Sequence, residues 1–143
     1  MEGYIWNKAM ETMPVEAMRR LQGERLASCV QRMYGTVPYY TERMKAAGVE
    51  PGDIRSLDDL TRLPFTDKED MRENYPYGTF AVPIEQIVRV HASSGTTGKQ
   101  KVVGYTAGDI DLWSECCCRA LNALPKGVVS TPPKSEMTAF NVP

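Results

Sequence analysis

The chain has 143 residues, of which 42% are hydrophobic and 24% are charged. This size and composition predict a soluble, globular chain with one hydrophobic core. Seventeen basic residues against eighteen acidic ones give a net charge of −1, which argues against nucleic acid or an anionic membrane as a partner.

The sequence lacks the signals of export and of membrane insertion. No apolar stretch approaches the roughly 20 residues of a spanning helix, and the first residues do not have the pattern of a signal peptide. Cys29 and the run Cys116 to Cys118 form neither a disulfide framework nor a CxxC pair. Free thiols in a reducing cytoplasm are therefore expected, with Cys117 as a small buried hydrophobic residue.

Residues 1–80 are predicted to be mainly helical. Pro14 suits the first position of a helix, and Gly35 is expected to end it. Between them apolar residues recur at helical spacing, namely Met18, Leu21, Leu26, Cys29 or Val30, and Met33. A second helix is expected from Tyr40 to Ala47, ending at Gly48, and a turn at residues 50–53 follows it.

Two short helices with capping boxes are expected next. The first begins at Ser56 with Asp59 three residues on, and Pro64 ends it. The second begins at Thr66, with Glu69 at the same offset. Residues 67–73, although acidic, are interpreted as a capped, solvated helix and not as a metal site.

The pattern changes after residue 80. The runs IVRVHA (87–92) and KVVGYT (101–106) are β-branched and compact, which predicts two strands. Thr106 is expected to cap a helix with one apolar stripe, made of Ile110, Trp113, Cys117, Leu121 and Leu124. A strand, a glycine-rich loop, a strand and a helix over residues 87–124 predict an α/β region after a helical lead-in.

The loop between the strands is the candidate phosphate-binding site. Residues 86–108 contain no carboxylate but three cations. Glycine allows the backbone to turn closely around a ligand, and convergent amides, hydroxyls and lysines can hold a polyphosphate. The candidate binding residues are Ser93, Ser94, Gly95, Thr96, Thr97, Gly98, Lys99 and Lys101. The spacing matches neither a Walker A loop nor GxGxxG, and composition alone leaves a flexible polar hairpin loop as an equal alternative.

The order of the loop residues adds a resemblance. SSGTTGKQK (93–101) resembles the phosphate loop of adenylate-forming enzymes. LPFTDKEDMRENYPYG (63–78) and VRVHASSGTTGKQKVVGYT (88–106) are similar to the phenylacetate–coenzyme A ligase family, and the likeness extends over about residues 4–121. Two departures stand out: Gln100 replaces the usual proline, and Lys101 fits the superfamily pattern better than that of the aryl-ligase branch.

The resemblance implies the beginning of the large adenylate-forming domain over residues 1–124, incomplete in this chain. It implies an enzyme that activates an aryl acid with ATP and Mg²⁺ and transfers the acyl group to coenzyme A. Ser94 to Gly98 would surround the β- and γ-phosphates, and either Lys99 or Lys101 would supply the positive charge. Ser93 is a weaker member of the set. The single histidine, His91, is interpreted as a structural strand-end residue.

Several expected parts of such an enzyme have no counterpart here. The lysine used for adenylation would lie beyond this chain, so no catalytic residue is assigned. Residues 125–143 contain four prolines without a clear period and are expected to be an irregular tail of a truncated or frame-shifted product. The chain alone is expected to be inactive, with unpaired strand edges and a tendency to aggregate. The alternative is a non-enzymatic helical interaction or dimerisation module, and a homodimer is left open.

Overall fold

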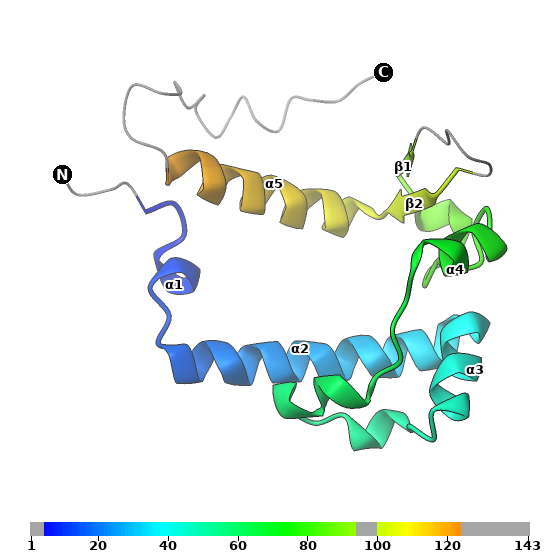
Figure 1. The fold of residues 1–143 in the computed structure, drawn as a ribbon. Coiled ribbons are helices and arrows are strands. Elements are labelled where there is room, and N and C mark those ends of the chain that lie inside the picture. The colour runs from blue at the N-terminus through cyan, green and yellow to red at the C-terminus, as the bar shows by residue number, and fades with distance from the viewer. Residues whose placement is uncertain (1–4, 94–99, 124–143) are drawn as a thin grey trace. The chain divides into compact units, whose positions relative to one another are not determined.

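The computed structural model describes residues 5–93 and 100–123. By their contacts these residues form two units, residues 14–107 and residues 5–13 with 108–123. The order of elements in the chain, shown in Figure 1, is α1 (Lys8–Glu11), α2 (Val15–Thr36), α3 (Pro38–Ala46), η1 (Pro51–Asp53), η2 (Leu57–Arg62), α4 (Lys68–Glu73), η3 (Ile84–Gln86), β1 (Arg89–Ala92), β2 (Val102–Tyr105) and α5 (Ala107–Asn122). The predicted helical lead-in is confirmed, and so is the order of two strands followed by a helix; residues 94–99 of the predicted loop lie outside the described residues.

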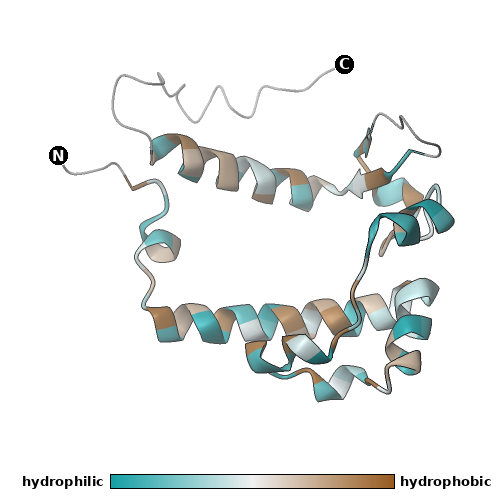
Figure 2. Cartoon of the chain, viewed as in Figure 1, coloured by the Kyte–Doolittle hydropathy of each residue, from teal (hydrophilic) through white to brown (hydrophobic). Residues whose placement is uncertain are grey.

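Helix α2 is the longest element of the larger unit, and its apolar positions build the core. Polar and apolar residues alternate along it (Figure 2). Val30 is buried whereas Cys29 is exposed, which settles the choice left open at these two positions. The core cluster comprises Val30, Met44, Val49 and Ile54, with Leu26, Tyr34 and Leu63 packed against it. The core therefore joins α2 and α3 to the turns that follow them.

The ends of α2 and α3 differ slightly from the prediction. Pro14 is the N-cap of α2 and not its first residue, and the helix continues through Gly35 to Thr36. Helix α3 then begins at Pro38, two residues before the predicted start, because proline is favourable at the first helical position. Gly48 has a φ of +66°, a left-handed conformation that glycine adopts without a steric cost, as expected for the stop after α3.

Of the two predicted capping boxes, the structure confirms the first and moves the second by one residue. Ser56 caps η2 and Asp59 completes the box as predicted, although the element is a 3₁₀ helix. The prediction for Thr66 was wrong by one residue, since Asp67 is the N-cap of α4 and Asp70 completes its box. Asp67 Oδ1 accepts hydrogen bonds from the backbone N–H groups of Glu69 and Asp70, so a carboxylate, favoured at a helix N-terminus, takes the place of the predicted hydroxyl.

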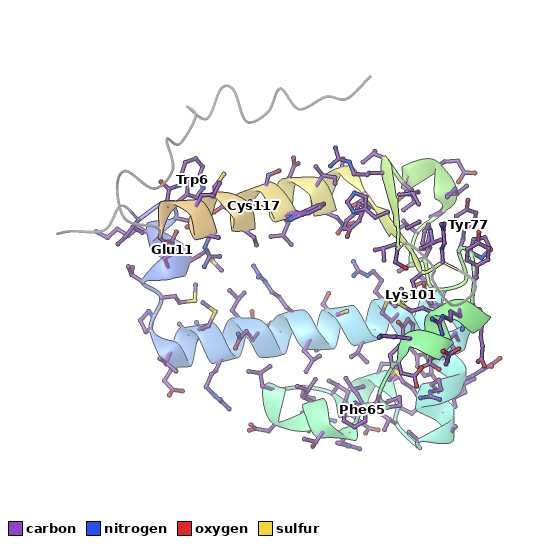
Figure 3. The ribbon with its side chains drawn as sticks, turned by 45° about the horizontal axis from the view of Figure 1, so that its top comes forward. Trp6, Glu11, Phe65, Tyr77, Lys101 and Cys117 are labelled. Atoms are coloured by element: carbon purple, nitrogen blue, oxygen red, sulfur yellow. The ribbon has the colours of Figure 1, made fainter. Side chains whose placement is uncertain are left out.

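Helix α4 is tied to α3 by one arginine. The Arg43 guanidinium donates to the carbonyl oxygen of Phe65 at 2.7 Å and lies 4.0 Å from Asp70. The Phe65 side chain itself is 92% exposed, and Figure 3 marks its position. The connection between α3 and α4 in this unit is therefore polar and backbone-directed, and the phenylalanine side chain does not contribute to it.

The smaller unit combines α1 with α5. Glu115 on α5 accepts hydrogen bonds from Trp6 Nε1 at 2.8 Å and Asn7 Nδ2 at 2.7 Å, and Arg119 lies 3.7 Å from Glu11. Figure 3 marks Trp6, Glu11 and Cys117 in this unit. The prediction that Cys117 is buried was wrong: Cys117 is exposed and Cys118 is buried, since one step along a helix rotates a side chain by about 100°. Leu124 and residues 125–143 lie outside the described residues.

Candidate functional site

Strands β1 and β2 form an antiparallel hairpin that carries the candidate site. The register pairs Arg89 with Tyr105 and His91 with Val103 on one face, and Val90 with Gly104 and Ala92 with Val102 on the other. Because neighbouring residues on a strand point to opposite faces, the next pair in this register, Ser93 with Lys101, belongs with the first set. The hairpin therefore has one face rich in polar side chains and one that is apolar.

Of the eight predicted binding residues, the structure describes Ser93 and Lys101 and brings them together. The Ser93 N–H donates to the Lys101 carbonyl oxygen at 3.0 Å, and the Lys101 N–H donates to Ser93 Oγ at 3.2 Å. Both residues are half-buried, and Figure 3 marks Lys101 at the start of the second strand. The other predicted residues, Ser94, Gly95, Thr96, Thr97, Gly98 and Lys99, lie outside the described residues.

The side chains of His91 and Tyr105 lie on the same polar face as Ser93 and Lys101. The rings of His91 and Tyr105 meet edge-to-face with their centroids 5.0 Å apart. This geometry is favourable for aromatic pairs, and it agrees with the structural interpretation of His91. Arg89 and Lys101 form no ion pair with any described carboxylate, so their charges on this face are available to an anion.

On the opposite face of the hairpin, Gly104 is covered by side chains that precede the hairpin in the chain. A β-carbon placed on Gly104 would lie 2.6 Å from Phe80 Cε2 and 3.0 Å from Ile87 Cδ1. Phe80 in turn contacts Tyr77, with ring centroids 5.2 Å apart. The sequence analysis missed this contact, although a glycine inside a strand is a known signal of close approach. Phe80 and Ile87 therefore cover this face at Gly104, whereas Val90 on the same face is 48% exposed.

The described residues offer no ready-made metal centre. No group of three or more His, Cys, Asp or Glu side chains among residues 5–93 and 100–123 is arranged to hold an ion. In the same part of the chain, no helix combines the length and the apolar character required to cross a membrane.

Comparison with known proteins gives close relatives, although no family model matches the chain. The chain is 52% identical over 114 residues to the phenylacetate–coenzyme A ligase of Escherichia coli (strain K12), which covers 80% of this chain and 26% of the relative. It is 50% identical over 119 residues to the corresponding ligase of Thermus thermophilus, with 83% and 27% covered. The chain thus spans about a quarter of the length of these curated relatives.

Solved structures give the same result for the fold. A 2-hydroxyisobutyryl-CoA ligase in complex with 2-HIB-AMP and CoA superimposes with a TM-score of 0.76 at 30% identity, over 82% of this chain and 26% of that one. An open conformation of that ligase gives a TM-score of 0.74 at 27% identity. The predicted resemblance is therefore confirmed: over four fifths of its length the chain is homologous to phenylacetate–coenzyme A ligases, and its fold is that of the N-terminal part of an adenylate-forming CoA ligase.

Proposed function

We propose that this chain supplies the phosphate-binding hairpin of an ATP-dependent ligase that joins an aryl acid, phenylacetate in the first instance, to coenzyme A. The observation that carries the proposal is the identity of about one residue in two to phenylacetate–coenzyme A ligases. A match of 114 residues in a chain of 143 includes residues 30–114 wherever it begins. The hairpin therefore lies inside the segment that the relatives share.

The proposed reaction has two steps, each with a defined leaving group. A carboxylate oxygen of the acid attacks the α-phosphorus of ATP, and the bond to pyrophosphate breaks. The thiol of coenzyme A then loses its proton and attacks the carbonyl carbon of the acyl-adenylate, which releases AMP and leaves a thioester. Negative charge builds on the departing pyrophosphate, and donors held in position around that charge stabilise the transition state.

The task proposed for this chain is to hold the β- and γ-phosphates. Ser94, Gly95, Thr96, Thr97 and Gly98 would provide amide and hydroxyl donors, with Lys99 or Lys101 as the cation, and Ser93 stands at the edge of the set. Residues 86–108 contain no carboxylate, so Mg²⁺ would enter bound to the phosphates of ATP, where it offsets negative charge.

The proposal also includes a cytoplasmic location and a homodimer. The four cysteines of the described residues are free thiols, which suits the cytoplasm.

An ATP titration of the chain tests the phosphate-binding role directly. Binding to the unmodified chain, to Lys101→Ala and to Lys68→Ala would be compared by calorimetry in the presence of Mg²⁺. Lys68 is an exposed lysine on α4 and serves as the control for the loss of one positive charge. We expect Lys101→Ala to weaken binding by about tenfold, the usual effect of losing one charged hydrogen bond, while Lys68→Ala has little effect. Because either lysine can be the cation, the double variant Lys99→Ala, Lys101→Ala is measured as well, and an affinity equal to that of the unmodified chain would contradict the proposal.

Enzymatic activity requires a second experiment, because the relatives are about three times as long as this chain. Residues 30–114 of this chain would replace the matching segment of the Escherichia coli ligase, and phenylacetate-dependent AMP formation would be measured with ATP, Mg²⁺ and coenzyme A. Retained activity in the chimera and its loss in a Lys101→Ala, Lys99→Ala version would support the ligase role. A folded chimera that binds no ATP would favour the alternative, a non-enzymatic helical interaction module.

A further inference from the structure

We infer that Ser93 is a positioning residue, whose hydroxyl holds the backbone of Lys101 in place and does not itself bind phosphate. The inference starts from the hydrogen bond between the Lys101 N–H and Ser93 Oγ at 3.2 Å. It deepens the proposed function by separating a residue that shapes the hairpin from the residues that contact the ligand. Its consequence for binding rests on that proposed function, whereas its consequence for the hairpin does not.

The pairing of the two strands explains why this hydrogen bond is unusual. In a regular antiparallel ladder, directly opposed residues alternate between pairs that exchange two backbone hydrogen bonds and pairs that exchange none. Ser93 and Lys101 make one such bond, from the Ser93 N–H to the Lys101 carbonyl oxygen at 3.0 Å. The return bond goes to the serine hydroxyl and not to its carbonyl. A side chain therefore replaces the backbone acceptor one register step beyond the last regular pair, Ala92 with Val102.

This geometry gives the Ser93 hydroxyl a direction. The bond holds the hydroxyl oxygen beside the backbone of the neighbouring strand, so one of its lone pairs serves the hairpin. The Lys101 side chain belongs to the same face as His91 and Arg89 by the strand register. Fixing the Lys101 backbone therefore fixes the point from which a flexible four-carbon side chain reaches toward an anion.

The Ser93 hydroxyl links the two strands and does not form a local turn. Serine and threonine hydroxyls commonly form local hydrogen bonds to the backbone that compete with regular pairing. Here the bond bridges eight residues of sequence, so it joins two strands and is not a local turn. Threonine could make the same bond, and its β-branch suits a strand, whereas alanine could not. The pair Ser93→Ala and Ser93→Thr therefore separates the loss of the hydroxyl from the loss of side-chain volume.

The first experiment measures the hairpin without any ligand. Amide hydrogen exchange at Lys101 would be followed by NMR in the full chain, in Ser93→Ala, in Ser93→Thr and in Ser28→Ala, an exposed serine on α2 that serves as control. We expect exchange at Lys101 to be roughly three- to tenfold faster in Ser93→Ala, the effect of losing one ordinary hydrogen bond, and to be nearly unchanged in the other two variants. Unchanged exchange in Ser93→Ala would overturn the inference.

The second experiment separates positioning from direct contact. The affinity for inorganic tripolyphosphate would be measured for Ser93→Ala, Lys101→Ala and the double variant. If Ser93 acts through Lys101, its replacement weakens binding in the presence of the lysine and has no further effect once the lysine is gone, since coupled residues are not additive. Additive losses would assign the hydroxyl to the ligand and overturn the inference. Absence of tripolyphosphate binding by the unmodified chain would count against the proposed function alone, and the exchange experiment would still decide the role of Ser93.

Discussion

The ring of Phe80 lies directly against the backbone of Gly104, at a distance that leaves no room for a β-carbon. Such an atom on Gly104 would stand 2.6 Å from Phe80 Cε2 and 2.7 Å from Phe80 Cζ. The contact joins the segment before the hairpin to the middle of β2. It therefore packs that segment against the hairpin at Gly104.

The first prediction is that Gly104→Ala destabilises the chain by about 1–3 kcal/mol, the usual cost of forcing an extra methyl group into a filled site. Gly35→Ala is the matched control, because nothing lies within 4 Å of its β-carbon position and the residue is inside α2. That variant should be more stable by about 0.5–1 kcal/mol. Urea unfolding measures both. Equal stabilities for Gly104→Ala and the unmodified chain would contradict the close contact, and a Phe80→Ala background should remove most of the penalty.

A second prediction concerns the start of α4. Asp67→Ala should lower the free energy of unfolding by about 1 kcal/mol, because it removes the acceptor for two backbone N–H groups. Thr66→Ala, one residue earlier, should have an effect below about 0.5 kcal/mol, as is usual for exposed positions without such a role. The same unfolding measurement compares the two. A larger loss for Thr66→Ala would restore the cap predicted from the sequence.

The two capping boxes, at Ser56 and at Asp67, show where a local sequence pattern is sufficient to predict a helix start and where it is not. At Ser56 one hydroxyl and one carboxylate three residues later match a single capping box, and the structure has it. At Thr66 and Asp67 two neighbouring residues each have an acidic residue three positions on, so the local pattern is ambiguous. The contact of Asp70 with Arg43 on α3 favours the second register, and no local pattern contains that contact.

The same reasoning applies to the hairpin and to α5. Two β-branched runs around a glycine-rich loop were enough to predict two strands. Their antiparallel register, which brings Ser93 near Lys101, comes from the structure. The choice of the Ser93 hydroxyl as acceptor depends on the geometry of one pair, which residue type alone does not determine. On α5 the buried thiol is Cys118 and not Cys117, so the buried side of the helix lies about 100° from the predicted one. On the same helix, Glu115 and Arg119 contact the N-terminal segment, more than 100 residues away in sequence.

A third prediction is a loss of stability in acid that depends on Asp59. The backbone N–H groups of Arg55 and Ser56 donate to its carboxylate at 3.0 and 2.9 Å and hold the pKa of Asp59 below its usual value. A carboxyl group with a lower pKa in the folded state contributes stability above the unfolded pKa of about 4. This contribution is lost as the pH falls through the folded pKa. The urea midpoint should therefore drop below about pH 4, and the drop should be shallower in Asp59→Asn.

Asp58→Asn is the control for this experiment. The Asp58 side chain is 85% exposed, and its ion pair with Arg19 at 3.2 Å is of the exposed kind that contributes little to stability. Its urea midpoint should follow that of the unmodified chain over the whole pH range. A parallel acid response of Asp59→Asn and Asp58→Asn would show that the capping hydrogen bonds do not stabilise the charged form of Asp59.

A fourth prediction tests the smaller unit through Glu115. Its two carboxylate oxygens accept from Trp6 and Asn7, so Glu115→Ala removes both acceptors at once. Loss of hydrogen bonds to a charged group should weaken the association of α1 with α5 by about 2 kcal/mol. The indole N–H signal of Trp6 reports this by NMR and should move toward the position of a solvated indole. Asp111→Ala, an exposed acidic residue on the same helix, should leave that signal in place, and a shift of equal size in both variants would contradict the specific contact.

A fifth prediction concerns the tendency of the hairpin to associate with other copies of the chain. Val90 on β1 is 48% exposed and Val102 on β2 is 9% exposed, so two valines of one hairpin differ in burial. Val90→Lys should reduce light scattering at a given protein concentration, because a charge on an exposed strand opposes edge-to-edge pairing. Val102→Lys should instead lower stability by several kcal/mol, since it buries an unpaired charge, and should increase scattering. The predicted tendency to aggregate would be contradicted if the replacement of the exposed valine did not lower the scattering and the unmodified monomer unfolded sharply and reversibly.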